Sequence, residues 1–578
     1  MMDASGSFIE IREIPFSYFG SWLNVSPVIG QHVYADDLHL VSHQNGQHAV
    51  LRMRPEGTAA ESGVDIHTDP ARLSWVAGVH RIDAVFESAD TLRVRGAGLG
   101  LTLSAANSTL TSFTGTYLFR DPRDGSFVFV VYETGLRYRV TVVTGIVARA
   151  EGLQQLGVAD RSLTLGSQPW EIAIEEFTSA RASYIATESF EHIVECSGTA
   201  FTAFVDAVAP WRSNLTPAVE AACYVLWTST VSPLGFMRRP SVLMSKHWMD
   251  KLWSWDHCFN ALALADGLPE LAIDQFLAPF DYQDESGAIP DSISHSEILR
   301  NFVKPPIHGW TFRQLEALLG DRLDAALKHE IYRVLSAWTR FWLDSRRVPG
   351  HTLAHYQHGN DSGWDNATSF DRGRLIETPE LAAFLIIQAR VCASLSAELG
   401  DGQTATWTRA ADEIRDALFD QLWTGTRFCV QSAHHDASWT SDSLLELVVI
   451  LLGDELTSDM TTALASGIDA HMTEWGPATE LPMSPKYESD GYWRGPIWAP
   501  STLLIEDGLR RAGCTELADE VSARFRRLCE RSGFAENFDA ITGAGLRDRA
   551  YTWTAACYLV LARRAAHDPN TPKANVQS

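Results

Sequence analysis

The segment from His358 to Asp371, HGNDSGWDNATSFD, concentrates three aspartates, two asparagines, two glycines and a tryptophan in fourteen residues. Neither helical nor strand periodicity accounts for it, which indicates a loop. At its centre Asp365 directly follows Trp364. An aromatic ring beside a carboxyl group excludes water and raises the pKa of the acid, so Asp365 is suited to donate a proton.

Four other loop segments mix aromatic residues with carboxylates in the same way. They are 245–259 (SKHWMDKLWSWDHCF), 281–294 (DYQDESGAIPDSIS), 474–498 (EWGPATELPMSPKYESDGYWRGPIW) and 533–553 (GFAENFDAITGAGLRDRAYTW). Helix N-caps and rim packing would explain one such loop, but five loops with one composition indicate a shared site. Glycoside hydrolysis needs this mixture, because one carboxylic acid protonates the leaving oxygen while a carboxylate activates water or attacks the sugar. Asp365 is the candidate acid and Glu536 the leading candidate base.

The elements that must position these loops are helices. After about residue 210 the apolar spacing predicts twelve of them, at roughly 216–231, 256–265, 268–279, 308–319, 321–345, 378–399, 403–423, 441–452, 456–471, 496–512, 515–532 and 550–566. Short and long connections alternate along the chain. Short connections make antiparallel neighbours, so all the long loops are expected at one end. This layout predicts an (α/α)6 toroid.

Residues 1 to about 205 have a different pattern, with short β-branched or alternating runs punctuated by turn residues. The predicted strands lie in 7–14, 48–54, 80–88, 91–105, 126–134, 136–150 and 170–177. Many short strands at close spacing favour an antiparallel β-sandwich. The expected organisation is therefore an N-terminal β-sandwich domain over 1–205, followed by an (α/α)6-barrel catalytic domain over 206–570.

Composition narrows the classes of partner. The formal net charge of the 578 residues is −25, which disfavours a nucleic-acid partner. The eight cysteines form no C-x-x-C pair, which indicates free thiols and a reducing compartment. The N-terminus lacks a signal-peptide pattern, and no run of about 18 apolar residues is found. We therefore expect a cytoplasmic protein with no membrane partner. No metal-ligand spacing is recognised, so neither a metal nor a cofactor is expected.

Four motifs carry a family resemblance. GNDSGWDN resembles the general-acid signature of glycoside hydrolase family 63 and the related trehalases. GYWRGPIWAPS looks like the substrate-binding motif of that group, ENFDAITGAG…YTWTAA is similar to its general-base segment, and LWSWDHCF to its first barrel loop. The four occur in the family's order over about 245–560. The resemblance implies inversion, with Asp365 as general acid and Glu536 as general base. The expected substrate-binding residues are Trp255, Asp256, Trp364, Trp493, Arg494, Trp498 and Trp553.

One position departs from the family. Many relatives have an arginine four residues after the acid, where this chain has Ser369, and Arg372 or Arg374 could substitute for it. The expected function is an exo-acting inverting α-glycosidase, first of all an α-glucosidase, acting on a small α-glucoside or oligosaccharide. The sequence leaves the linkage, the aglycone, the terminal sugar and the oligomeric state open.

Several alternatives remain open on the sequence. Asp361 could be the acid, and Glu480 or Glu488 the base. A non-hydrolytic carbohydrate-binding protein would keep the tryptophans without needing both carboxylates. A sugar isomerase or epimerase on the same toroid would want histidines in the pocket, and the loops offer His247, His257, His295 and His308. A trehalase or a glucosyl- or mannosylglycerate hydrolase is a minor alternative.

Overall fold

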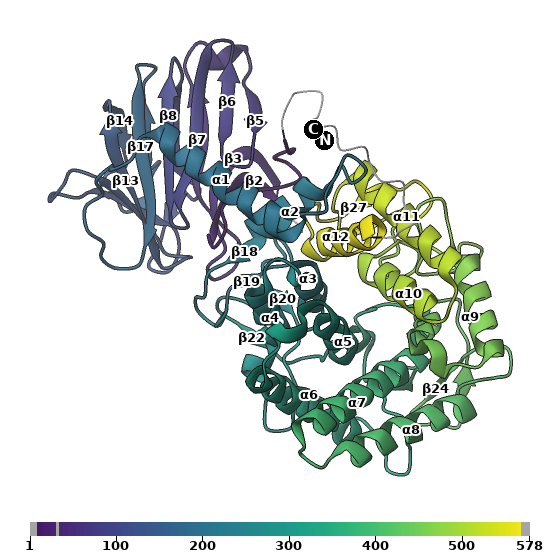
Figure 1. The fold of residues 1–578 in the computed structure, drawn as a ribbon. Helices are drawn as coiled ribbons and strands as arrows, with labels where there is room; N and C mark the ends of the chain where they lie inside the picture. The colour runs from purple at the N-terminus through teal and green to yellow at the C-terminus, as the bar shows by residue number, and fades with distance from the viewer. Residues whose placement is uncertain (1–7, 30–33, 568–578) are drawn as a thin grey trace. The chain divides into compact units, whose positions relative to one another are not determined.

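A computed structural model describes residues 8–29 and 34–567, which fall into two compact units (Figure 1). The β unit consists of Met1–Asp206, Cys223–Lys251 and Ser294–Ser296. The helical unit consists of Ala207–Ala222, Leu252–Ile293 and Glu297–Ser578. Each unit is described separately below.

Two antiparallel sheets form most of the β unit. The first has the order β1 (Phe16–Ser17), β2 (Leu23–Ile29), β3 (Tyr34–Ser42), β4 (His48–Glu56), β9 (Gly100–Ala105), β16 (Ser162–Leu165) and β14 (Val147–Glu151). The second has the order β11 (Thr116–Arg120), β12 (Phe127–Val131), β13 (Leu136–Thr144), β17 (Trp170–Phe177), β8 (Thr91–Ala97), β7 (His80–Ser88), β6 (Leu73–Ala77) and β5 (Asp65–Thr68). Strands of both sheets contribute to one apolar core, which includes Leu40, Leu103, Phe86 and Ile172. An N-terminal antiparallel β-sheet domain is therefore confirmed.

The β prediction was wrong in two places. Residues 8–14 form turns, because the amides of Glu13 and Ile14 both donate to the carbonyl of Glu10, each at 2.9 Å. Residue 7 of that predicted strand lies outside the described residues. The range assigned to β structure also contains α1 (Phe190–Val208). Its apolar residues recur at helical spacing, but they are mostly β-branched or aromatic, so propensity masked the period.

Each of the twelve predicted helical ranges contains a helix. They are α2 (Val219–Ser229), α3 (Asp256–Leu264), α4 (Pro269–Leu277), α5 (His308–Leu319), α6 (Ala325–Ser345), α7 (Pro379–Leu399), α8 (Thr404–Gln421), the 3-10 helix η6 (Leu444–Glu455), α9 (Ser458–His471), α10 (Ala499–Arg511), α11 (Thr515–Ser532) and α12 (Thr552–His567). Local signals fix several ends. Asp324 caps α6 by accepting from the amide of Leu327, and Gly400 ends α7 in the left-handed conformation.

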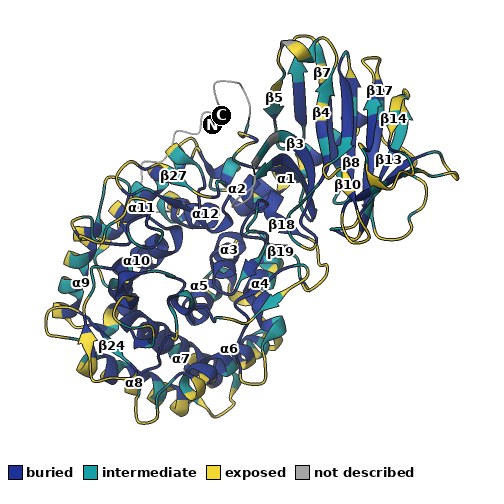
Figure 2. Cartoon of the chain, turned by 180° about the vertical axis from the view of Figure 1, so that it is seen from behind, coloured by how far each residue is buried: buried dark blue, intermediate teal, exposed yellow. Residues whose placement is uncertain are grey.

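Six helices of the helical unit contact one another in a closed order. α3 contacts α5, then α7, η6, α10 and α12 follow in turn, and α12 contacts α3 again. Five further helices pack on this set, with α4 on α3, α6 and α8 on α7, α9 on η6, and α11 on α10. Figure 2 shows α3, α5, α7, α10 and α12 largely buried, while α8, α9 and α11 carry exposed residues. A helical domain thus follows the β-sheet domain.

Helix α7 bears on the expectation that no segment of the chain spans a membrane. By length and composition it would suffice to cross a membrane, although Glu380, Arg390 and Glu398 interrupt its apolar sequence. Of its most apolar window, 83% is buried inside the protein. This burial follows from its packing against α5, α6, α8 and η6, since a helix surrounded by other helices needs apolar residues all round.

Candidate active site

Asp365 lies in the connection between α6 and α7, between the short 3-10 helices η4 (Gly359–Ser362) and η5 (Thr368–Phe370). The segment before it is held by Asp361, whose carboxylate accepts from the amides of Val303 (3.1 Å) and Gln357 (2.9 Å) and pairs with Arg346 (2.8 Å). Both oxygens of Asp361 are thus occupied by structural contacts. This argues against Asp361 as the alternative acid.

Two glycines allow this loop to pack closely. A Cβ atom on Gly359 would lie 2.1 Å from the carbonyl oxygen of Asp365. Gly363 has φ of +74°, and a Cβ atom there would lie 2.5 Å from the ring of Trp255. Any larger residue at either position would displace the acid or the ring beside it. The glycines of GNDSGWDN are therefore explained by backbone geometry.

The segment after the acid is fastened by Asn366. Its side chain donates to the carbonyl of Gly491 and accepts from the amide of Trp493, each at 3.0 Å. Its carbonyl accepts from Arg494 Nε at 2.7 Å. Arg494 also pairs with Asp371 (2.5 Å), so its guanidinium holds the acid loop. Its direct contact with a sugar stays a prediction.

The position where many relatives have an arginine is filled differently. Ser369 is buried, and its hydroxyl donates to Glu446 at 3.0 Å. Arg372 and Arg374 are both exposed. Neither is among the charges that act most on Asp365, which are those of Lys304, Asp291 and His358. That one of the two arginines takes this place stays a prediction. Two cations from a different loop, Arg494 and Lys486, bind the end of this segment through Asp371.

Glu536 lies near the start of the connection between α11 and α12. Its amide donates to the carbonyl of Asp548 at 2.7 Å, across the hairpin of β26 (Asn537–Phe538) and β27 (Gly545–Leu546). Phe538 exchanges two backbone hydrogen bonds with Ile497, at 2.8 and 3.0 Å. The loop that carries Glu536 is thus hydrogen-bonded to the segment that contains Trp493 and Trp498. Glu480, an alternative base, instead accepts from the hydroxyls of Thr368 and Ser484, and Glu488 is exposed.

Asp256 is the first residue of α3, and a small sheet places it. Strands β20 (Leu252–Trp253), β21 (Ser292–Ile293) and β22 (Ile298–Leu299) pair antiparallel, and the amide of Ser254 donates to the carbonyl of Asp291 at 3.0 Å. The loop before α3 is therefore joined to the loop after α4. Asp291 was not assigned a role from the sequence, although its loop was singled out.

The five predicted site tryptophans form one array. The rings of Trp493 and Trp498 are stacked at 4.1 Å between centroids, with Trp364 at 4.7 Å from Trp493. Trp553 lies edge-on to Trp498 (5.5 Å) and to Trp255 (5.7 Å). All five are 1–4% exposed. Flat aromatic surfaces with low hydration are the usual walls of a sugar-binding site.

The carboxyl groups around this array are electrostatically coupled. Burial raises the pKa of Asp256, Asp365 and Glu536. The negative charge of Asp365 further raises the pKa of both Asp256 and Glu536. Ionisation of one candidate catalytic group therefore disfavours ionisation of the other. Arg547 opposes the rise at Glu536, and Lys304 opposes it at Asp256 and Asp365. Buried carboxyls with shifted and coupled protonation are typical of acid–base catalysis.

Two buried polar atoms of the predicted substrate-binding residues have no hydrogen-bond partner among the residues that the structure describes. They are Oδ2 of Asp256 and Nε1 of Trp493, in side chains that are 3% and 1% exposed. A buried polar atom without a partner costs about 1–3 kcal/mol. Sugar hydroxyl groups, which both donate and accept, would satisfy both atoms.

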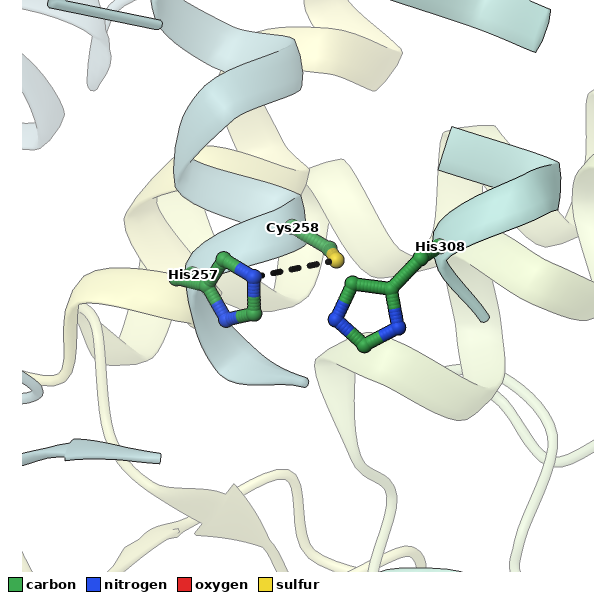
Figure 3. A group of neighbouring side chains, drawn as sticks. All are labelled: His257, Cys258 and His308. Atoms are coloured by element: carbon green, nitrogen blue, oxygen red, sulfur yellow. Dashed lines mark hydrogen bonds between the residues drawn. The ribbon is translucent and has the colours of Figure 1, made fainter. Parts of the chain in front are cut away.

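The histidines do not form a second catalytic site. His247 and His295 belong to the β unit, whereas His257 and His308 are buried in the helical unit. His257, Cys258 and His308 form the group drawn in Figure 3. Their potential metal-ligand atoms lie within 4.8 Å of one another. Within the described chain no other such group of His, Cys, Asp or Glu occurs. His257 Nδ1 donates to the carbonyl of Trp253 (3.1 Å), and its Nε2 lies 3.6 Å from Cys258 Sγ. Burial lowers the pKa of both imidazoles and raises that of the thiol, so the group is neutral.

The geometry permits one type of chemistry above others. Asp365 and Glu536 reach the tryptophan array from two different loops; Glu536 is buried and Asp365 is partly buried. One can donate a proton to a leaving oxygen while the other takes a proton from water.

Comparisons with known proteins agree with this chemistry. A model described as the mannosylglycerate hydrolase MGH1-like glycoside hydrolase domain matches residues 249–554, which contain all nine predicted site residues. A mannosylglycerate hydrolase of Rubrobacter radiotolerans is 23% identical over 403 residues, 53% of this chain and 89% of the relative. A glucosylglycerate hydrolase of Mycolicibacterium hassiacum is 20% identical over 446 residues, 61% of this chain and 99% of the relative. The crystal structure of a GH63 mannosylglycerate hydrolase from Thermus thermophilus with glucose shares the fold, with a TM-score of 0.54 and 21% identity over 60% of this chain and 100% of that one.

The chain is therefore a glycosidase, which sets aside the non-hydrolytic binding protein and the isomerase. The family match covers more than half of the sequence. This shows that the chain belongs to the mannosylglycerate hydrolase MGH1-like family of glycoside hydrolases, of the GH63 type.

Proposed function

We propose that this glycoside hydrolase is an exo-acting, inverting α-glycosidase that removes one terminal hexose from a small α-glycoside. Its first candidate substrates are hexosylglycerates, α-mannosyl- and α-glucosylglycerate. Two relatives named for these compounds align over 89% and 99% of their own length. This supports hexosylglycerates ahead of the neutral α-glucosides expected from sequence alone, and ahead of trehalose.

The proposal includes the architecture. The closed order of six contacting helices supports an (α/α)6 toroid, with residues 206–570 as the catalytic domain. The loops that carry the candidate site follow α2, α4, α6, α9 and α11 along the chain. We further infer a reducing, cytoplasmic setting, since all eight cysteines are free thiols.

One observation carries the proposal: the partly buried Asp365 and the buried Glu536, from loops far apart in the sequence, lie beside the same tryptophan array and are electrostatically coupled. In the proposed reaction Asp365 gives its proton to the glycosidic oxygen as the bond to the anomeric carbon breaks. Glu536 takes a proton from water, whose oxygen bonds to that carbon from the opposite face. The products are a β-hexose and the free alcohol, with Asp365 ionised and Glu536 protonated until Glu536 releases its proton to solvent and Asp365 takes one up.

Proton NMR of the anomeric signals tests the proposal. Purified protein is mixed with α-mannosylglycerate, α-glucosylglycerate, maltose, kojibiose and trehalose, and the first minutes are followed. We expect the β-hexose signal first, its loss in Asp365→Asn and Glu536→Gln, and its retention in Glu488→Gln, which changes an exposed carboxylate. An α-hexose signal first would refute inversion. Release from maltose or trehalose but not from either glycerate would refute the substrate class.

A further inference from the structure

A buried lysine connects two of the loops at the candidate site. Lys304 lies between β22 and α5 and is 5% exposed. Its Nζ atom forms an ion pair with Asp291 Oδ1 at 3.2 Å and donates to the carbonyl of Asn360 at 3.0 Å. Asp291 is in the loop joined to Asp256, and Asn360 is in the turn that leads to Asp365. Lys304 therefore contacts the sugar-binding side and the acid side at once.

Neighbouring contacts give the connection a defined geometry. The amide of Val303 donates to Asp361 Oδ1 at 3.1 Å, and the ring of Phe302 stacks on His358 with centroids 5.0 Å apart. Residues 302–304 are thus bound to residues 358–361 by three consecutive side-chain or backbone contacts. Because Asp365 follows this turn by only a few residues, a shift of the 302–304 segment would move the acid.

The charge of Lys304 acts on three carboxyl groups. It lowers the pKa of Asp256 and of Asp365 against the effect of burial, while Asp256, Asp291 and Asp365 together raise the pKa of Lys304. A buried ammonium group is tolerated only when it is paired in this way. The other titratable groups that act on Asp365, or that sense its charge, are Asp256, Asp291, His358, Tyr492 and Glu536.

We propose that Lys304 is a positioning residue for the hydrolysis: it holds the Asp365 loop against the Asp291 loop and is the counter-charge shared by the carboxyl groups of the site. This inference rests on the proposed roles of Asp365 and Glu536. It assigns Lys304 no proton transfer. Its two effects are separable, because the hydrogen bond to Asn360 needs only a donor, whereas the charge needs a cation.

Three substitutions separate these effects. Lys304→Met removes donor and charge, Lys304→Gln keeps a donor without charge, and Lys304→Arg keeps the charge. The pH dependence of kcat/KM is measured for each on the substrate identified by NMR. Removing a nearby positive charge raises a carboxyl pKa by about one unit or more. We therefore expect the high-pH limb, set by deprotonation of Asp365, to rise by about one pH unit in the Met and Gln variants and to stay in place in the Arg variant.

A fourth variant should shift the high-pH limb of the kcat/KM profile in the opposite direction. The charge of Asp291 raises the pKa of Asp365, so Asp291→Asn should lower the same limb. At pH 7, kcat/KM of Lys304→Met should fall about tenfold or more, since misplacement of a catalytic group by about 1 Å can cost 10²-fold. Thermal unfolding of each variant establishes that it is folded, and Asp291→Asn tests the charge coupling even if no Lys304 variant folds.

The outcomes are distinguishable. A purely structural Lys304 would give slower variants with an unmoved high-pH limb, and Gln would restore the rate as well as Arg. Unmoved limbs in Lys304→Met, Lys304→Gln and Asp291→Asn would refute the inference. If Asp365→Asn and Glu536→Gln kept their activity, the proposed function itself would fail instead.

Discussion

Replacing Asn366 by alanine should cost both stability and activity, because this side chain fastens the acid loop to the Gly491–Arg494 segment. The change removes two hydrogen bonds of 3.0 Å, one to the carbonyl of Gly491 and one from the amide of Trp493. It retains the backbone bond from Arg494 to the carbonyl of residue 366. The attachment of the acid loop to the Gly491–Arg494 segment is therefore weakened rather than removed.

The magnitude follows from the two lost bonds. Each contributes about 1 kcal/mol net, and a buried amide left without a partner costs about 1–3 kcal/mol. We expect the free energy of unfolding of Asn366→Ala to fall by about 2–4 kcal/mol. Because Asp365 is the preceding residue, kcat/KM should fall by about 10- to 100-fold. Urea unfolding followed by fluorescence, and initial rates on the substrate identified by NMR, measure the two quantities.

Asn360→Ala is the matched control on the same loop. Its backbone carbonyl, which Lys304 contacts, is unchanged, so its effect should stay within about 0.5 kcal/mol. Equal losses in the two variants would show that the loop is merely sensitive to truncation. Lost stability with full activity in Asn366→Ala would show that the two side-chain hydrogen bonds of Asn366 do not position the acid.

Three further predictions concern burial and backbone geometry. Burial raises the pKa of Glu536 in the folded state, so the wild type loses stability as pH rises from the unfolded pKa through the raised one; Glu536→Gln should match it near pH 5 and exceed it at pH 9, by about 1.4 kcal/mol for each pH unit that separates the two pKa values, in urea titrations. Gly363→Ala should be markedly less active and less stable than Gly402→Ala, since both have φ near +75° but only the first places a Cβ atom against Trp255; equal effects in melting and rate assays would refute that contact. Thiol titration with a chromogenic disulfide should find one fast thiol in the native protein, the exposed Cys196, and eight after denaturation; several fast native thiols would contradict the burial.

The sequence predicted those features that depend on local pattern. The helical period located twelve helices to within a few residues, and the mixture of tryptophan and carboxylate identified five tryptophans that pack into one array. Gly363 is required in the motif because its φ angle is positive and its Cα lies close to the ring of Trp255. Such local constraints can be recognised in the sequence as a glycine at a fixed position.

Features that depend on long-range contacts were missed. Lys304 donates to a carbonyl 56 residues away, and no spacing rule connects the two. The contacts of Arg494 with Asn366 and Asp371, which belong to another loop, were not predicted either. Helix α1 was missed because its β-branched and aromatic residues favour strands, whereas burial of one face decided in favour of a helix.

The closed order of helices has a consequence for how the enzyme is made. The last helix, α12, packs against α3, and Asn260 contacts Thr552 across 292 residues of chain. Glu536 and Trp553 lie on the loop before α12 and on α12 itself, so a ribosome must synthesise the chain through this helix before the second carboxyl group can meet the first. Contacts of such sequence separation form late, since a long loop must close before they bring any gain. Emergence of α12 should therefore act as the checkpoint at which an inert nascent chain becomes an enzyme.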